Sequence, residues 1–210
     1  MLYHLLFPLA KYAGALNVFR YVTFRTAGAF LTALLLGLVL GPYLIRRLEA
    51  LKAGQVIRDD GPQSHLRKAG TPTMGGVLIL LAVTAATLLW AQLNNRFIWL
   101  ALLATLAMGA VGFADDYLKI ARGTSVGLRP RQKFAWQVGI GLAVGAYLCL
   151  FPVDAFTTKL AIPFLKRWMP ELGLAYIAFA MLVIVGCSNA VNLTDGLDGL
   201  AIVPTLMAAA

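Results

Sequence analysis

The chain has 210 residues, of which 60% are hydrophobic and 13% are charged, and its formal net charge is +9. Soluble domains contain about 45–50% apolar and about 25% charged residues, so this composition excludes an ordinary soluble domain. The positive charge does not indicate a nucleic-acid partner, because most basic residues lie in short connections between long apolar segments. We predict an all-α, polytopic integral membrane protein.

The N-terminal residues 2–19 place apolar side chains at roughly helical spacing, which predicts an interfacial or short membrane-embedded helix. Five apolar segments of roughly membrane-spanning length follow, and a sixth begins near Leu197. The five are 28–45, 77–93, 97–114, 134–151 and 172–187. The sixth offers about 21 Å of helix before Ala210, which is less than a hydrocarbon core of ~30 Å.

We therefore expect a single transmembrane domain over residues 1–210, with about six transmembrane helices and an incomplete C-terminus. Within the first and fourth segments, Gly37/Gly41 and Gly141/Gly145 are spaced four residues apart. This spacing is typical of helices that pack closely against a neighbour, so we interpret both pairs as packing sites.

The basic residues predict the orientation. Six of them lie between the first and second segments and five between the third and fourth, whereas only Arg96 lies between the second and third, and three lie between the fourth and fifth. By the positive-inside rule, connections 46–76 and 115–133 face the cytoplasm, as does 188–198 after the fifth segment. The N-terminus is then outside.

Three motifs meet at this predicted cytoplasmic face. The first is KAGTPTMGG, residues 68–76, in which Lys68, Thr73 and the backbone amides of a helix start could surround an anionic oxygen. The alternative is a purely structural role, in which the motif is a capped helix entry with Thr73 as the N-cap.

The second motif is ADDYLK, in which Asp115 and Asp116 end an apolar segment. In a helix they would point about 100° apart, with Lys119 within one turn of both. Such carboxylates could bind a divalent cation, position a phosphate or accept a proton. They could also be a solvated helix end, although the helix dipole disfavours acids there.

The third motif is NAVNLTDGLDGLA, which sets Asn189, Asn192, Asp195 and Asp198 in an apolar sequence. Two Asp-Gly steps and two amides exceed what a turn needs, and the spacing is not that of an EF-hand. The three motifs together offer oxygen ligands suited to Mg²⁺, amides, and cations for phosphates.

In this order, GTPTMGG, ADDYLK and NAVNLTDGLDGLA resemble the polyprenyl-phosphate N-acetylhexosamine-1-phosphate transferases. The first motif resembles the branch whose donor carries N-acetylmuramoyl-pentapeptide. The resemblance covers the whole chain and about the N-terminal three fifths of a roughly ten-helix family fold. It implies a bacterial inner-membrane enzyme that transfers phospho-N-acetylmuramoyl-pentapeptide from UDP to undecaprenyl phosphate, with Mg²⁺, and that forms the first lipid-linked peptidoglycan precursor.

The resemblance also implies roles for individual residues. Asp115 and Asp116 match the catalytic pair, and Asp198 matches a metal-proximal position. The implied substrate-binding residues are Lys68, Thr73, Asn189, Asn192 and Asp195. The family's third aspartate and histidine-rich loop have no counterpart here, so we expect this stretch alone to be inactive. A homodimer would fit the family.

Two alternatives remain open from the sequence. One is a related transferase of N-acetylglucosamine phosphate, and the other is an ion-coupled secondary transporter. A transporter would place its acids near the middle of its helices. Here the acids Asp115, Asp116, Asp195 and Asp198 lie at segment ends, which favours the transferase.

Overall fold

The computed structural model describes residues 1–50, 74–124, 126–152, 158–162, 164, 168–194, 202, 205 and 207. Within these ranges the regular structure is helical, and the β-type pairing is a single bridge between Lys159 and Glu171. The all-α prediction is confirmed. The chain forms two compact units, residues 1–133 and residues 134–210.

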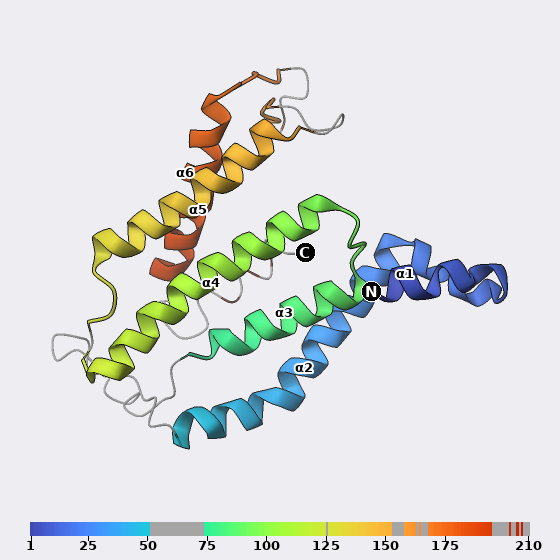
Figure 1. Cartoon of the computed structure of the whole chain (residues 1–210), viewed down its shortest axis with the longest axis horizontal. Coiled ribbons are helices and arrows are strands. Elements are labelled where there is room, and N and C mark those ends of the chain that lie inside the picture. Colours follow the sequence, from blue (N-terminus) through green and yellow to red (C-terminus); the bar gives the residue numbers. More distant parts are fainter. Residues whose placement is uncertain are drawn as a thin grey trace. The chain divides into compact units, whose positions relative to one another are not determined.

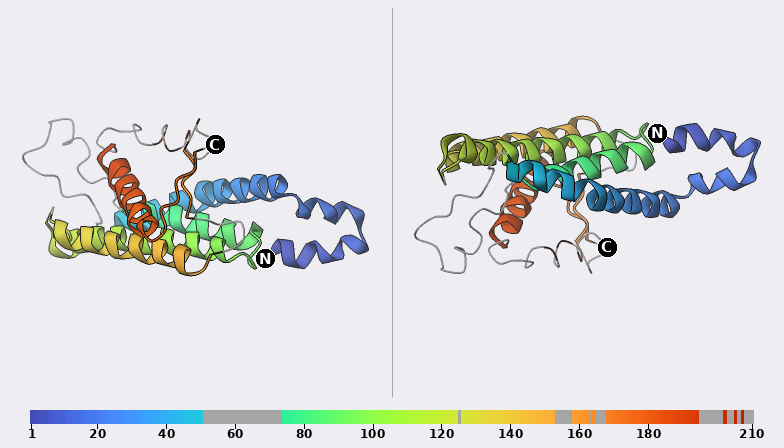
Figure 2. Two further views of the ribbon diagram at one scale, coloured as in Figure 1. Left: turned by 90° about the horizontal axis from the view of Figure 1, so that it is seen from above. Right: turned by 90° about the horizontal axis from the view of Figure 1, so that it is seen from below.

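The N-terminal segment is helical, but in three short pieces rather than one. They are α1 (Leu2–Leu6), η1 (Pro8–Lys11) and η2 (Gly14–Arg20). Pro8 lacks an N–H and begins a new helix, as proline does at a first helical position. Figure 2 shows the segment running away from the end of α3 and returning to α2. The imidazole Nε2 of His4 accepts a hydrogen bond from the Leu93 N–H at 3.1 Å, which attaches α1 beyond the end of α3.

Three longer helices complete the first unit: α2 (Val22–Ala50), α3 (Gly76–Trp90) and α4 (Arg96–Arg122). Figure 1 shows α3 between α2 and α4, with successive helices running in opposite directions. The buried apolar residues Ala82, Ala86, Leu102 and Val111 lie on α3 and α4. Small side chains let these helices approach closely, as in other membrane bundles.

Among the described residues, four helices are long and apolar enough to cross a membrane, namely α2, α4, α5 (Pro130–Leu150) and α6 (Ala175–Thr194). The predicted segment 77–93 corresponds to α3, which has 15 residues and reaches about 22 Å. It is shorter than predicted because the chain leaves the helix at Ala91, which is extended. The sixth predicted helix lies largely outside the described residues. Many large apolar side chains of α2 are exposed, as expected for a helix that faces lipid.

In the second unit, α5 and α6 pack closely and in opposite directions. A Cβ atom built on Gly145 would lie 2.8 Å from the carbonyl oxygen of Ile177, and one on Gly141 would lie 3.0 Å from Cα of Met181. Any larger residue would push the two backbones apart. The predicted packing role of Gly141 and Gly145 is confirmed.

The same prediction for α2 is wrong at Gly37. No described atom lies within 4 Å of a Cβ built there, and at Gly41 the nearest is Cδ2 of Leu78 at 3.6 Å, which is an ordinary contact. Four-residue glycine spacing is therefore compatible both with a packed face and with an open one. The spacing alone does not say whether another helix reaches the glycines.

Candidate active site

The C-terminal end of α4 carries Asp115 and Asp116. The predicted third segment ends at Ala114, but the helix continues to Arg122, so both aspartates and Lys119 lie on helical turns. The helix ends at Gly123, whose φ of 62° is in the left-handed region that glycine adopts without strain. The N–H groups of Gly123 and Thr124 bind the carbonyls of Ile120 and Lys119 at 3.1 and 3.2 Å. This cap reverses the chain.

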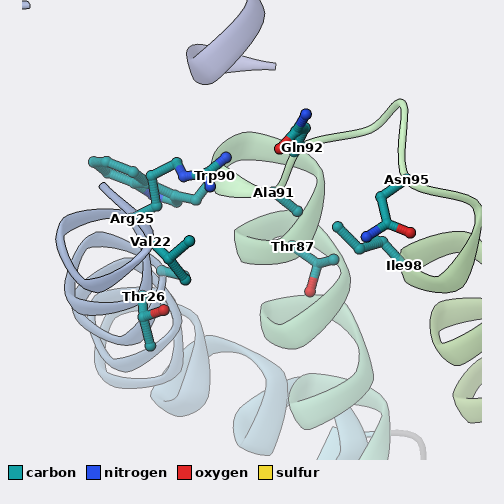
Figure 3. A pocket seen from close by; sticks show the side chains of 10 residues that line it. Val22, Arg25, Thr26, Thr87, Trp90, Ala91, Gln92, Asn95 and Ile98 are labelled. Carbon is teal, nitrogen blue, oxygen red and sulfur yellow. The ribbon is translucent and has the colours of Figure 1, made fainter. Parts of the chain in front are cut away.

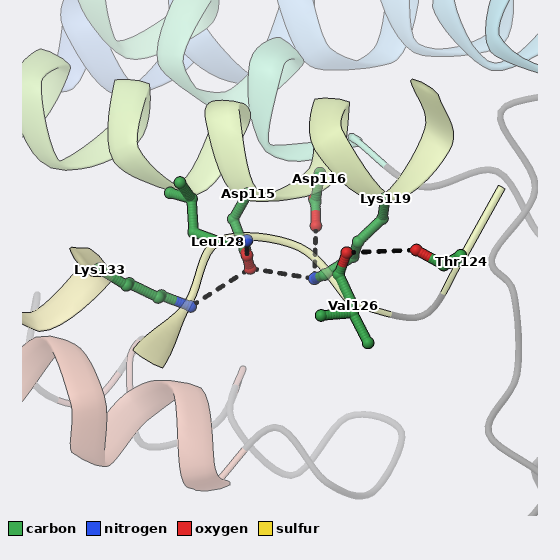
Figure 4. Close-up of polar contacts among 7 residues, drawn as sticks. All are labelled: Asp115, Asp116, Lys119, Thr124, Val126, Leu128 and Lys133. Carbon is green, nitrogen blue, oxygen red and sulfur yellow. Dashed lines mark hydrogen bonds and ion pairs between the residues drawn. The ribbon is translucent and has the colours of Figure 1, made fainter. Parts of the chain in front are cut away.

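After the reversal, the chain returns along α4 and closes over Asp115 (Figure 4). The Leu128 N–H donates to Oδ1 of Asp115 at 2.8 Å. Gly127 is buried, and a Cβ built on it would collide with this carboxylate and lie 2.7 Å from the Asp115 carbonyl oxygen. Only glycine allows the loop to approach this closely, since it has no side chain.

Two lysines neutralise the carboxylates. Lys119 Nζ lies 3.0 Å from Oδ2 of Asp115 and 3.1 Å from Oδ1 of Asp116, so it bridges the pair as its position one turn away predicted. Lys133 Nζ, at the start of α5, lies 3.5 Å from Oδ2 of Asp115. The four residues are shown with the loop in Figure 4.

The two aspartates differ in accessibility. The side chain of Asp115 is 12% exposed, and its oxygens accept from Leu128, Lys119 and Lys133. The side chain of Asp116 is 33% exposed and contacts Lys119 through Oδ1. Asp115 is therefore held in place by its surroundings, whereas Asp116 is the carboxylate that a substrate or ion can reach more readily.

Sequence reasoning missed Gly127, Leu128 and Lys133 as parts of this site. In the sequence, Lys133 is one of the five basic residues between the third and fourth segments that predict the orientation. It lies 18 residues from Asp115, and helical periodicity does not relate the two because α4 ends at Gly123 between them. The one available signal was the Gly-Leu step between Lys119 and Lys133, which is too common to be specific.

The third motif is described only in part, and it lies in the second unit. The Asn189 amide donates from Nδ2 to the Gln137 side-chain oxygen and to the Val185 carbonyl, both at 2.8 Å. Gln137 is buried, so this pair is a polar contact within the α5–α6 interface. Asn192 is exposed one turn further along α6. Asp195 and Asp198 lie outside the described residues.

The first motif is described from Met74 onward, and Lys68 and Thr73 lie outside the described residues. The N-cap of α3 is Gly75, with no side-chain cap hydrogen bond, so the alternative that made Thr73 the N-cap is wrong. Met74 has φ of 74°, a conformation that non-glycine residues rarely adopt. The chain therefore enters α3 through a constrained turn that contains no acidic or basic side chain.

The carboxylates of Asp115 and Asp116 are candidate metal ligands. Their hard oxygens suit Mg²⁺. In the described part of the chain, no group of three or more His, Cys, Asp or Glu side chains is close enough to hold an ion. Asp115 is already occupied by a backbone N–H and two lysines. Asp116 is the described residue that fits a metal site, provided that other ligands complete it.

Known protein families match this chain in the regions that contain the three motifs. The profile of glycosyl transferase family 4 matches residues 98–210, which include the aspartate pair and the third motif. A signature described as phospho-N-acetylmuramoyl-pentapeptide-transferase signature 1 matches residues 68–80, which include the first motif.

Similar curated proteins carry the name phospho-N-acetylmuramoyl-pentapeptide-transferase. The one from Citrifermentans bemidjiense is 58% identical over 210 residues, and the one from Geobacter sp. (strain M21) is 58% identical over 204 residues. The protein from Pelobacter propionicus is 57% identical over 210 residues. These alignments cover 97–100% of this chain but only 56–58% of the relatives, so the chain spans less than two thirds of their length.

Proposed function

This chain belongs to glycosyl transferase family 4, and from that premise we propose that the whole protein transfers phospho-N-acetylmuramoyl-pentapeptide from UDP to undecaprenyl phosphate. The products are UMP and the first lipid-linked peptidoglycan precursor. The observation that carries the proposal is the identity of 58% over all 210 residues to a relative of that name. The signature at residues 68–80 favours this donor over N-acetylglucosamine phosphate.

In the proposed reaction, an oxygen of the lipid phosphate attacks the phosphorus that carries the sugar. A new P–O–P bond forms, and the bond to the UMP oxygen breaks. A phosphate monoester has a second pKa of about 6, so the acceptor is largely dianionic at neutral pH and needs no strong base. The enzyme must instead hold two anionic reactants in line.

The aspartates have different parts in this scheme. Asp116, the more exposed carboxylate, orients the acceptor and removes its remaining proton. Asp115 holds Lys119 and Lys133 at the end of α4, so that their charge faces the incoming phosphates. An active site that binds diphosphate through fixed cations loses less free energy to reorganisation during the reaction.

The remaining predicted residues complete the proposal. Lys68, Thr73, Asn192 and Asp195 bind the donor, whereas Asn189 contributes by positioning α6 through Gln137. Asp198 would help to hold a Mg²⁺ ion. When bound, this ion neutralises charge on the diphosphate. The enzyme lies in the bacterial inner membrane with its active site cytoplasmic, and a homodimer would fit the family.

The proposal is tested with the protein expressed from its complete gene. Asp198→Asn should abolish most UMP release from the UDP-linked donor while the variant still inserts into membranes and elutes as a folded species. Near-normal turnover would refute the metal assignment. Lys68→Ala should raise the donor KM more than it lowers kcat, because a cation on the diphosphate contributes uniform binding.

A competing mechanism has an aspartate attack the donor to form a phosphorylated enzyme. Incubation of the complete protein with radiolabelled donor, in the absence of the lipid acceptor, distinguishes the two. Direct transfer leaves no label on the protein. Label retained on wild type and lost in Asp116→Asn would replace the proposed mechanism with the covalent one.

A further inference from the structure

A second charged site lies at the other end of the first unit. Arg25, in the first turn of α2, is 9% exposed, and its Nε and Nη1 atoms are buried without a hydrogen-bond partner among the described residues. Its guanidinium is covered on one side by the Tyr3 ring, 4.6 Å from Cζ. Buried polar groups are nearly always hydrogen-bonded, and a buried cation is costly unless an anion pairs with it.

No described acidic side chain of this unit can be that anion. The candidates are Glu49, Asp115 and Asp116, and all three lie toward the opposite ends of α2 and α4. Along α2, Glu49 is 24 residues from Arg25, which corresponds to about 36 Å of helix. Within the described part of this unit, Arg25 therefore has no acidic partner, and its charge is available to an anionic ligand.

Arg25 lines a pocket of about 380 Å³ between α2, the end of α3 and the beginning of α4. Figure 3 shows the Arg25 side chain beside Trp90, with polar side chains spread around the rest of the wall. These are Thr26, Thr87, Gln92 and Asn95. They offer hydrogen-bond donors to an anion, while Val22, Ala29 and Ile98 provide an apolar wall. The volume lies at the low end of the range for small-molecule sites.

The pocket lies at one boundary of the membrane. Ile98 lines it near the start of α4, and Asp115 lies 17 residues later on the same helix, which is about 26 Å. This length is close to the thickness of a hydrocarbon core. Trp90 and Phe19 stack beside the pocket with ring centroids 5.9 Å apart, and aromatic residues gather at membrane interfaces.

We propose that the pocket formed by Arg25 and the ends of α2, α3 and α4 binds the phosphate group of a membrane phospholipid. Arg25 lines the pocket, and its guanidinium can donate a charged hydrogen bond to a phosphate oxygen that binds there. Phosphate groups of the bilayer lie at this depth, so the ligand is present wherever the protein is. This site is separate from the proposed active site and does not depend on the proposed reaction.

The test measures lipid binding to the complete protein in detergent by native mass spectrometry. Three probes are added separately: phosphatidylglycerol, diacylglycerol with the same chains and no phosphate, and inorganic phosphate. We expect phosphatidylglycerol to bind wild type, with Arg25→Gln weakening it at least about tenfold, as for loss of a charged hydrogen bond. The matched control is Arg20→Gln, which removes the same charge from an exposed residue of η2 and should leave binding unchanged.

Arg25→Lys keeps the charge without the planar fork, so we expect intermediate binding. If Arg25→Gln elutes as aggregate, Arg25→Lys and Thr26→Val carry the test, because Thr26 is exposed and lines the same pocket. Equal phosphatidylglycerol binding by wild type and Arg25→Gln would overturn the site. Equal binding of diacylglycerol would overturn phosphate recognition, and inorganic phosphate that binds as tightly as the lipid would overturn the lipid source.

Discussion

At the scale of single residues, Asp115 and Asp116 are adjacent in the sequence but have different surroundings. Asp115 faces the returning loop and accepts from the Leu128 N–H, whereas Asp116 lies about 100° further round the helix and is more exposed. Both share Lys119. The two carboxylates are therefore in different settings: Asp115 is held by the loop, and Asp116 is accessible.

The variant Asp116→Asn tests the role of the accessible carboxylate separately from that of the buried one. We expect UMP release to fall at least about a hundredfold, because the acceptor phosphate would no longer be held in line with the donor. The midpoint of thermal unfolding should change little, because an exposed ion pair contributes at most about 1 kcal/mol. Asp115→Asn is the comparison, and it should lower both quantities, with a loss of about 1–3 kcal/mol in the free energy of unfolding for a disrupted buried hydrogen-bond network. Turnover in Asp116→Asn near that of wild type would contradict the assignment.

Gly127→Ala tests whether loop closure places Asp115. The new methyl group would collide with the Asp115 carboxylate and carbonyl, so we expect destabilisation of about 1–3 kcal/mol, together with lower UMP release. Gly112→Ala is the control, because it lies on α4 with no described atom within 4 Å of the new Cβ. Equal thermal stability of Gly127→Ala and wild type would show that the loop does not approach Asp115 this closely.

At the scale of elements, α5 and α6 are held by small residues and one polar pair. Gly145 permits backbone contact with Ile177, and the Gln137–Asn189 hydrogen bond begins about two turns away along α5, in the same interface. Interhelical hydrogen bonds in membranes contribute modestly, about 0.6 kcal/mol on average. The pair therefore sets the register of the two helices more than it sets their stability.

A double-mutant cycle measures this pair. Gln137→Ala and Asn189→Ala should each destabilise the protein, and their effects should be non-additive by about 0.6–1.7 kcal/mol in the free energy of unfolding. Gly139→Ala serves as the control on α5, since no described atom lies near its Cβ position. Strict additivity, combined with loss of donor binding in Asn189→Ala alone, would instead support direct contact between Asn189 and the substrate.

At the scale of the whole molecule, the helices of the first unit separate two chemically different ends. One end carries Asp115, Asp116 and the two lysines, and the other carries Arg25 and an aromatic cluster. The basic connections predict that the aspartate end faces the cytoplasm. Each end would then meet a different side of the bilayer.

Cysteine labelling tests this orientation. In a variant with Cys149 and Cys187 replaced by serine, Asn94→Cys and Thr124→Cys are both exposed and lie at opposite ends of α4. A membrane-impermeant maleimide should label Asn94→Cys in intact spheroplasts and Thr124→Cys only after lysis. The reverse pattern would invert the predicted topology and place the aspartate pair outside.

The apolar segments could be predicted from the sequence because hydrophobicity is a local property. Segments 28–45, 97–114, 134–151 and 172–187 all correspond to helices, and Lys119 lies beside both aspartates because three- and four-residue spacing is intrinsic to a helix. The ends were less predictable, since α4 continues eight residues beyond Ala114 as a polar helix. The open face at Gly37 was not predictable, because it depends on which helix packs there.

By itself, the sequence determined the all-helical membrane class, the order of three motifs and the family, because each depends on residues close together along the chain. Only the tertiary structure decided that Gly127 and Leu128 close over Asp115 and that Lys133 joins the pair. It also decided that Arg25 lies buried in a pocket built from three helices. These contacts arise where the chain reverses or where separate helices meet, and no local pattern specifies which residues then face each other.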